Sequence, residues 1–429
     1  MNRHTSSKSW KFGVVLALFV LGMCLPAAAQ VTIEYMSWYV DAERIHIEEE
    51  IIRRFNESQD RIRVEFLNPG TSSANGAFEV LAVLIAGGSA PDVSAIASYE
   101  AAQLPNIALD ITPYIERDRI DLGALRWHDP RIIQHQGRYY GLPWGYGDRM
   151  LAVNLSHFEE AGLSTPQKGW LSEDFIDVAR RLTRDLNGDG TPDQFAAQLN
   201  NGGDYETWLA IYDAPVVDPD TGEVLVTAPN FVAATEEFVS LWQPLGVRGG
   251  NFGNGAASMW PRWEGQIPGL MTASLFENNK LGFVHFHRPS ASEPTRTLSQ
   301  GHVLSVLKSS PHPDEAWEFM KFYMSDEAQQ ILGRNYLYPS TRAGVIAMVE
   351  EGIVPPGYDR RELLGILLDP AEPHIPPHHI PGANDAFQAV RSALAPAYAG
   401  DSAVQPLLEG IVGALRASLE AARAAAGRD

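Results

Sequence analysis

The sequence predicts an α/β protein of two lobes, built from mostly parallel sheets that helices flank. Strand-like segments alternate with segments of helical periodicity along the first hundred residues, which is typical of a parallel sheet covered on both faces. The chain has 429 residues, which is too many for one simple core and suits two lobes. These two observations lead to the fold class, and each element is justified below.

The first 29 residues are typical of a secretory signal peptide. Basic residues such as Arg3 and Lys11 precede the apolar run FGVVLALFVLG, and small residues are placed for cleavage after Ala29. This run is short for a bilayer, and no later apolar stretch reaches spanning length. We therefore predict that residues 1–29 are removed and that the protein is periplasmic or otherwise extracytoplasmic.

The exported chain lacks cysteine and is acidic. Cys24 is the only cysteine and leaves with the signal peptide, and Met23 before it disfavours a lipid anchor, which requires a small residue there. Stability must then come from packed cores rather than disulfides. The formal charge of −20 argues against nucleic acid and anionic membranes as partners, and most of the carboxylates serve solubility.

Periodicity predicts the first elements of the chain. They are a strand over Val31 to Ser37, a helix marked by Ile47, Ile51 and Phe55, a strand over Arg61 to Leu67, a helix over Ala77 to Gly88 and the short buried strand VSAIA. In such sheets ligands bind beyond the carboxyl ends of the strands. Candidate cleft residues therefore follow the first and third strands: Trp38, Tyr39, Ser98, Tyr99 and Glu100. The alternative for each is a surface loop.

A glycine-rich segment over Gly141 to Leu163 supplies further candidates. Trp144, Tyr146 and Asp148 lie among glycines that allow the backbone to bend, so we expect the aromatic rings to stand exposed before a strand and a helix. Another helix is predicted over Ser172 to Asp185.

Several motifs in order give the chain a resemblance to a known family. They are AGGSAPDV (86–93), GRYYGLPWGYGDRMLAVNLSHFEEAGL (137–163), DLNGDGTPDQF (185–195), GAASMW (255–260), HPDEAWEFMKFYMSDEAQQIL (312–332) and YPSTRAG (338–344). With these motifs the chain resembles the bacterial extracellular solute-binding proteins of family 1, the sugar-binding receptors of ABC importers.

The resemblance implies a periplasmic-binding-protein fold whose two lobes close on a ligand in the cleft between them. Residues 30–142 and 282–336 would form lobe one, and residues 143–281 and 337–429 lobe two. The implied partners are a carbohydrate, most simply an oligosaccharide, and the permease subunits of an ABC importer. No cofactor is required, and we expect a monomer.

Sugars present apolar C–H faces and rings of hydroxyl groups, so their sites combine flat aromatic surfaces with directed polar groups. The densest tryptophan cluster is MWPRWEG, where Trp260 and Trp263 are the best stacking candidates and Arg262 suits vicinal hydroxyls or a carboxylate. In related receptors the loop at this position faces the cleft. The alternative is that one tryptophan packs in the core.

The segment LSQGHVLSV forms a second candidate loop. Many relatives have Gly-Gly-Trp where this chain has Gln300, Gly301 and His302, so a stacking tryptophan is replaced by a ring that hydrogen-bonds. Tyr338 is a further candidate, because the chain of related receptors passes near the cleft there.

A basic segment, RWHDPRIIQHQGR, bears on the charge of the ligand. Its basic and histidine residues are Arg126, His128, Arg131, His135 and Arg138. If several face the cleft, an acidic sugar or a phosphorylated polyol fits. We expect them to be solvated turn residues, which predicts a neutral oligosaccharide.

The aspartate-rich loop and a histidine-rich segment raise the question of metals. Ligand spacing of a calcium loop is met by Asp185, Asn187, Asp189, Thr191 and Asp193. Ala196 stands where an EF-hand has a bidentate glutamate, so calcium is possible and a structural turn is the alternative. In EPHIPPHHIP, Pro376 and Pro377 preclude a helix that would bring His374 and His378 together, which disfavours zinc.

Two other classes of function compete with the receptor. A secreted hydrolase or lyase acting on carbohydrate would use carboxylates assembled in space, which sequence spacing does not reveal. The chain contains no GxSxG, HExxH or phosphate-loop motif, so we predict that it is not an enzyme. A ligand-sensing partner of a membrane sensor would use the same fold, and neighbouring genes would distinguish it.

Overall fold

The computed structural model describes most of the chain. The described residues are Met1, 30–38, 44–71, 73–126, 130–267, Leu270, 279–335, 337–352, 360–368, 371–374 and 376–426. The predicted signal peptide after Met1 lies outside these residues, and so do Tyr39 and His128. The predictions for them therefore stay predictions.

The first three predicted elements are confirmed. β1 (Val31–Met36) and β2 (Ile62–Leu67) pair in parallel, and α1 (Ile45–Ser58) connects them. Ile47, Ile51 and Phe55 are buried on one face of α1, as their four-residue spacing predicts. The ring of Phe55 lies 5.3 Å from that of Phe319 in α10 (Pro313–Tyr323), so both helices cover the same core.

The next helix and strand are confirmed as well. α2 (Ala74–Gly87) begins after Ser73, whose hydroxyl accepts a hydrogen bond from the Gly76 N–H. It ends at Gly88, which has a φ of 71° that glycine adopts without strain. β3 (Val93–Ala97) is buried at all five positions and runs parallel to β1. The parallel β-α-β arrangement of the first part is thus correct.

The glycine-rich segment differs from its prediction. Instead of a loop followed by a strand, Leu142–Asn154 form one strand, β6, whose thirteen residues are all buried. The expected exposure of Trp144 and Tyr146 is therefore wrong. Gly147 is required here for close packing rather than for a turn, because a β-carbon at this position would clash with the ring of Tyr338.

β6 and β10 (Arg296–Val306) are long antiparallel partners that cross the molecule. Residues 142–148 of β6 pair with β10, and residues 149–154 pair with β8 (Ala257–Trp263) and β9 (Leu281–Val284). The sheet order is β2-β1-β3-β10-β6-β8-β7, with β7 spanning Phe195–Ala197. β10 and β8 are antiparallel to β6, so the sheet is mixed rather than mostly parallel. Local periodicity predicts where strands occur. It does not predict whether strands that are far apart in the sequence pair in parallel or antiparallel.

Helices surround this sheet at both ends. Around the N-terminal strands lie α3 (Leu104–Ile107), α4 (Thr112–Asp118) and α11 (Asp326–Arg334), and the small strands β4 (Gln134–His135) and β5 (Arg138–Tyr139) form a hairpin. The remaining elements are α5 (Leu155–Glu160), α6 (Ser172–Leu182), α7 (Gly203–Ile211), α8 (Pro229–Ser240), α12 (Arg342–Glu350), α13 (Arg360–Leu368), β11 (Glu372–His374), α14 (Ala383–Ala393), α15 (Ala395–Ala399) and α16 (Val404–Ala425).

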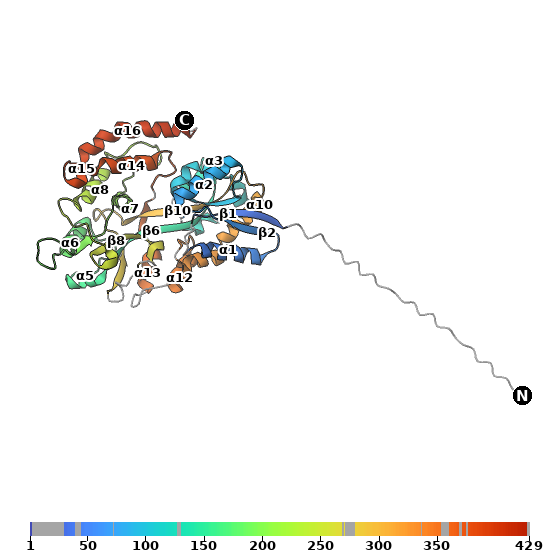
Figure 1. Cartoon of the computed structure of the whole chain (residues 1–429), viewed down its shortest axis with the longest axis horizontal. Helices are drawn as coiled ribbons and strands as arrows, with labels where there is room; N and C mark the ends of the chain where they lie inside the picture. Colours follow the sequence, from blue (N-terminus) through green and yellow to red (C-terminus); the bar gives the residue numbers. More distant parts are fainter. Residues whose placement is uncertain are drawn as a thin grey trace.

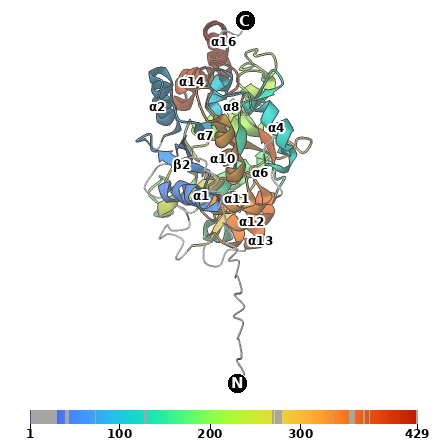
Figure 2. The same cartoon turned by 90° about the vertical axis from the view of Figure 1, so that its right-hand side faces the viewer.

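The molecule has two lobes with β6 and β10 between them. In Figure 1, β1, β2, α1, α2 and α10 lie at one end, and α5, α6, α8 and α16 lie at the other. We call these the N-terminal and C-terminal lobes. Figure 2 shows α14 and α16 at the same side of the molecule as α2, with α12 and α13 at the opposite side.

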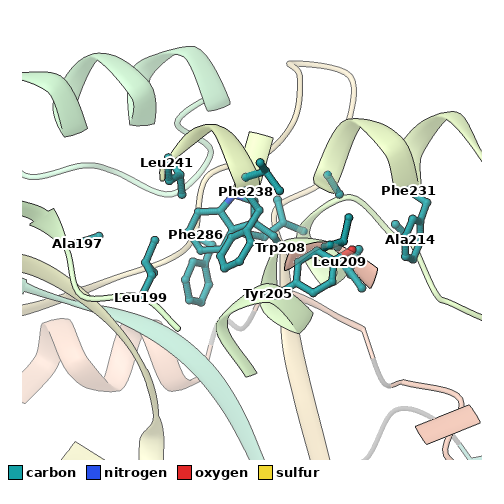
Figure 3. Close-up of a cluster of buried hydrophobic side chains, with 14 of the residues drawn as sticks. Ala197, Leu199, Tyr205, Trp208, Leu209, Ala214, Phe231, Phe238, Leu241 and Phe286 are labelled. Carbon is teal, nitrogen blue, oxygen red and sulfur yellow. The ribbon is translucent and has the colours of Figure 1, made fainter. Parts of the chain in front are cut away.

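Each lobe has its own core. In the N-terminal lobe Tyr35, Trp317 and Tyr323 are fully buried together. In the C-terminal lobe the ring centres of Trp208 and Phe238 lie 5.1 Å apart. Figure 3 shows these two side chains in one cluster with Phe286. Burying aromatic side chains of this size supplies the main stabilisation of each lobe.

The chain crosses between the lobes along β6 and β10, and the predicted lobe boundaries remain predictions. Leu142 of β6 belongs to the N-terminal core, and Leu151 of the same strand belongs to the C-terminal core. In the other crossing strand, Leu304 of β10 lies in the N-terminal core. Val284 of β9 and Phe286 pack in the C-terminal core. Across the described residues, no helix combines the length and the hydropathy that a membrane span requires.

Candidate functional site

The carboxyl ends of two parallel strands in the C-terminal lobe border a pocket. β7 and β8 pair in parallel, with Phe195 opposite Ala257, and the chain leaves both at the same edge. The pocket there has a volume of about 460 Å³. It is lined by Arg149, Gln198, Leu199, Asn200, Arg248, Gly249, Gly250, Trp260, Pro261, Arg262, Trp263 and Gln266. This is the position at which α/β sheets bind ligands.

Three residues predicted from MWPRWEG line this pocket. Trp260, Arg262 and Trp263 are all half-buried. The guanidinium carbon of Arg262 lies 3.9 Å from the ring centre of Trp260, so the two groups are stacked. The segment is the end of strand β8 and not a loop, because residues 259–263 pair with β6. Trp263 also packs against the core of the N-terminal lobe, which places it where the lobes meet.

Arg149 is a pocket residue that the sequence did not single out. Its side chain is 7% exposed, and its Nη2 lies 2.7 Å from a carboxylate oxygen of Asp204 in α7. Its guanidinium carbon lies 5.4 Å from the ring centre of Trp263. The only indication in the sequence is that an arginine occurs within a buried strand. An arginine that forms an ion pair in the core would give the same indication, so the sequence does not identify Arg149 as a pocket residue.

The first predicted loop of the N-terminal lobe lies across from this region. Trp38 is half-buried, and its ring lies 5.1 Å from that of His302. Ser98 is fully buried at the end of β3, and Glu100 is half-buried. Burial, with a smaller contribution from the carboxylate of Asp385 in α14, raises the pKa of Glu100 to about 7. Glu100 and Asp385 thus come from opposite lobes and are close enough to interact electrostatically. Side-chain placements of Tyr39 and Tyr99 fall outside the description.

A crevice between the lobes has a volume of about 310 Å³. Ile132, Ile133 and Tyr140 line it from the N-terminal lobe, and Pro219 and His379 line it from the C-terminal lobe. A larger pocket of about 810 Å³ adjoins Arg131, but its lining residues include four carboxylates and no Trp, Tyr or Phe. It therefore lacks a surface on which a sugar ring would stack.

Two predicted aromatic residues of β6 are structural in this arrangement. Trp144 is fully buried and lies 5.7 Å from Tyr323, within the N-terminal core. The hydroxyl of Tyr146 donates a hydrogen bond to Asp148 at 2.9 Å. Both side chains are buried, so ligand contact would require the structure to open.

Asp148 belongs to a buried polar network between the lobes. It accepts hydrogen bonds from Tyr146 and Ser299, and its other oxygen lies 3.7 Å from Arg126. Arg126 also lies 3.4 Å from Glu264, which is fully buried after β8. Burial raises the pKa of Glu264, while Arg126 opposes that rise. The network joins residues of both lobes at the crossing strands.

The predicted loop LSQGHVLSV is part of strand β10. Gln300 is half-buried opposite Gly147, and His302 is 3% exposed. Its ring stacks 5.5 Å from Trp144, and burial lowers the pKa of His302 to about 3. His302 is therefore neutral at physiological pH.

Tyr338 lies beside these residues at the second crossing of the chain. Its φ is 45°, and its carbonyl oxygen accepts a hydrogen bond from the Tyr146 N–H at 2.9 Å. The side chain is 8% exposed and packs over Gly147. Like His302, it lies close to the candidate site but is largely covered.

The described basic residues of RWHDPRIIQHQGR are paired with carboxylates of the protein. Arg131 lies 2.8 Å from Asp220 of the other lobe, and Arg138 lies 3.4 Å from Asp110. Arg126 is buried in the network above, so the expectation that it is a solvated turn residue is wrong. Long-range contacts of this kind have no local sequence signal.

The aspartate-rich loop is closed by hydrogen bonds within itself. Asp193 accepts from the backbone N–H groups of Leu186 and Asn187, and Asp185 accepts from those of Gly188 and Gly190. These bonds lower the pKa of Asp185. As arranged, the loop carboxylates do not form a metal-binding group of three, and no such group of His, Cys, Asp and Glu occurs among the described residues. The calcium prediction stays a prediction.

The histidine-rich segment makes protein contacts. His374 lies 3.2 Å from Asp213, and the His379 ring lies 2.9 Å from the carbonyl oxygen of Pro219. These contacts hold the segment against the turn that contains Asp220.

Comparisons with known proteins agree with this architecture. Residues 46–330 match the family described as bacterial extracellular solute-binding protein. No curated protein matches the chain. The sugar-binding protein MalE from Xanthomonas citri has a similar structure, with a TM-score of 0.76, 17% identity, and coverage of 93% of this chain and 100% of that one.

Two further solved structures are similar. An ABC substrate-binding protein from Listeria monocytogenes, in complex with cycloalternan, has a TM-score of 0.73 and 18% identity, and covers 91% of this chain and 99% of that one. UgpB from Mycobacterium tuberculosis, in complex with glycerophosphocholine, has a TM-score of 0.73 and 15% identity, and covers 91% and 98%. These likenesses confirm the two-lobed binding-protein fold.

The fold and the family match together define a class of solute receptors. The chain belongs to the bacterial extracellular solute-binding protein family, since the match extends over most of its length. The family resemblance predicted from the motifs is confirmed, and the family is one of extracytoplasmic receptors.

Proposed function

We propose that this protein is an extracytoplasmic receptor that captures a carbohydrate between its lobes and delivers it to an ABC importer. The observation that carries the proposal is the pocket at the ends of β7 and β8. It places the indole rings of Trp260 and Trp263 beside the amide side chains of Gln198 and Gln266. Flat apolar rings next to fixed hydrogen-bonding groups are what a sugar requires.

The arrangement of the two lobes supports capture by closure. Trp263 packs against the N-terminal core, and Arg131 and Asp220 form an ion pair between the lobes at 2.8 Å. A ligand that contacts both sides would stabilise the closed state relative to the open one. The importer would then distinguish the loaded receptor by its shape.

The names of similar structures support a carbohydrate. Cycloalternan occupies the Listeria monocytogenes protein, and the Xanthomonas citri protein is described as sugar-binding. We also propose that residues 1–29 direct export, that the mature protein is a monomer without a required cofactor, and that it does not catalyse a reaction on its ligand.

The proposal is tested by thermal shifts of the purified mature protein with neutral oligosaccharides, uronates, polyols and their phosphates. A ligand at about 100 times its Kd stabilises the folded state by about 2.7 kcal/mol. We expect one class of saccharide to raise Tm, with the saccharide recovered unchanged. No shift with any saccharide would contradict the receptor, and product formation would identify an enzyme.

A further inference from the structure

The pocket beside Trp260 is electropositive in a strongly acidic protein. The whole chain has 53 acidic and 33 basic residues, yet the pocket is lined by three arginines and no carboxylate. Arg149 comes from β6, Arg248 from the segment before β8, and Arg262 from β8 itself. Three separate parts of the chain therefore deliver positive charge to one place.

Arg262 has no carboxylate partner within the described part of the chain. It is held by stacking on Trp260, and its Nε atom is buried without a hydrogen-bond acceptor. Burial and the nearby charge of Arg149 lower the pKa of Arg262 to about 10, which reflects an environment that disfavours a further positive charge. An anion that reaches this guanidinium would supply both an opposite charge and hydrogen-bond acceptors.

Arg149 is only partly compensated. One of its terminal nitrogens donates to Asp204 and to the carbonyl oxygen of Pro261, and the other donates to Thr207 and to the carbonyl oxygen of Gly203. Only its buried Nε has no acceptor in the ranges that the structure describes. Glu206 lies nearby, but burial raises its pKa to about 7, so it carries only part of a charge at neutral pH. Asp204 is therefore the carboxylate that pairs with Arg149, and among the described residues it forms no ion pair with Arg262 or Arg248.

Arg248 and the amide side chains add hydrogen-bond donors. Arg248 uses its Nε to bond the carbonyl oxygen of Leu199 at 2.9 Å, which fixes the guanidinium at the rim. The side-chain oxygens of Gln198 and Gln266 accept bonds from the backbone N–H groups of Phe252 and Trp263. Their NH₂ groups remain as donors, since none has an acceptor among the described residues. The pocket is rich in donors, which suits a ligand rich in acceptors.

We propose that the pocket seats an anionic group of the carbohydrate ligand, so that the receptor selects acidic saccharides. Arg262 and Arg248 would bind the anion, Arg149 would add its positive charge nearby, and Trp260 and Trp263 would contact the ring that bears the anion. A uronate carboxylate is the form we favour, because forked arginines match a planar carboxylate. Phosphate and sulfate esters share this chemistry. The inference rests on the proposed function and makes its ligand class specific.

Isothermal titration of the mature protein with matched saccharides tests this inference. The probes are oligogalacturonate, oligoglucuronate and oligomannuronate, each beside its methyl-esterified neutral form, together with sugar phosphates and sulfates. We expect one acidic saccharide to bind at least about tenfold tighter than its neutral counterpart, with an affinity that falls as salt rises. The phosphate and sulfate arms identify which anion is preferred.

The outcomes separate this inference from the proposed function. If a neutral saccharide binds as tightly as its acidic form, or tighter, the anion site is overturned while the receptor stands. If no saccharide binds in either form, the proposed function fails and the inference fails with it.

Variants of the pocket arginines locate the anion. Arg262→Gln should lower the affinity for the acidic saccharide by about 10- to 100-fold, because a hydrogen bond to a charged group is lost. The affinity for the neutral form should fall by much less. Arg262→Lys should restore part of the affinity. Arg248→Gln repeats the test at an exposed position, and the exposed Arg61→Gln is the matched control. Equal losses for acidic and neutral forms would overturn the assignment.

Discussion

Tryptophan side chains illustrate how far single residues can be interpreted from sequence. Trp144 and Trp317 are fully buried, whereas Trp260 and Trp263 are half-buried beside arginines. MWPRWEG was selected because two rings and a cation stand close together in the chain. These residues line a pocket, and their contact with a ligand stays a prediction. Trp144 looked similar in sequence, and only its contacts with distant residues show that it belongs to the core.

This contrast gives a prediction for the tryptophans. Trp260→Ala and Trp263→Ala should each weaken saccharide binding by about tenfold or more, because a stacking surface is removed. The ligand-free protein should lose little stability. Trp144→Ala is the matched control, and it should cost about 3–5 kcal/mol of unfolding free energy through a core cavity. Titration calorimetry and urea unfolding measure both effects. A loss of that size in Trp260→Ala would place Trp260 in the core instead.

Glu48 leads to a prediction about pH. It is fully buried and accepts hydrogen bonds from the hydroxyl groups of Ser37 at 2.6 Å, Tyr323 at 2.9 Å and Tyr35 at 3.2 Å. Burial raises its pKa from 4.5 to about 7, although the three donors oppose the rise. Since the folded pKa is above the unfolded one, this contribution to stability is present below pH 4.5 and is lost as the pH rises through 7.

Glu48→Gln should therefore remove part of the pH dependence. The unfolding free energy of the natural protein, relative to the variant, should fall by roughly 3 kcal/mol between acid and neutral pH, at about 1.4 kcal/mol per pKa unit. Urea unfolding at a series of pH values measures the difference. Glu49→Gln, one residue away and exposed, should leave the profile unchanged. Parallel profiles for Glu48→Gln and the natural protein would contradict the prediction.

Single elements were predictable where their signals are local. β1, α1, β2, α2 and β3 follow from periodicity and from the glycines after α2, and all five are present. The strands β6 and β10 were interpreted as loops in part, because glycine is typical of turns. Gly147 is needed instead for Tyr338, a residue far along the chain, and no local pattern contains that contact.

The aspartate-rich loop gives a prediction at the level of the element. Asp185 and Asp193 hold the turn through backbone N–H groups, and calcium binding would have to replace some of these bonds. If the predicted calcium site exists, about 10 mM calcium should raise Tm by roughly 2–4 °C, as for a weak extracellular-type site. Differential scanning fluorimetry of metal-free protein measures it. Asp193→Asn should lose the response, and magnesium is the control. An unchanged Tm would leave only the structural turn.

For the whole molecule, the order of motifs along the chain was sufficient to predict two lobes and the family. The arrangement of charge at the centre was not predictable. Arg126, Asp148 and Glu264 come from three distant segments and meet where the lobes join. Arg149 and Arg248 likewise reach the pocket only through the fold. A sequence shows which residues are basic, whereas the tertiary structure decides which of them are neutralised.

The position of β10 also governs the order in which the chain can fold. β10 pairs directly with β3, although roughly 200 residues separate the partners in sequence. During synthesis, the sheet formed by β1, β2 and β3 therefore has no strand to pair with the outer edge of β3 until residue 306 has been made. Pairing over such a distance is slow to form. The sheet of the N-terminal lobe is therefore completed only after most of the chain has been synthesised.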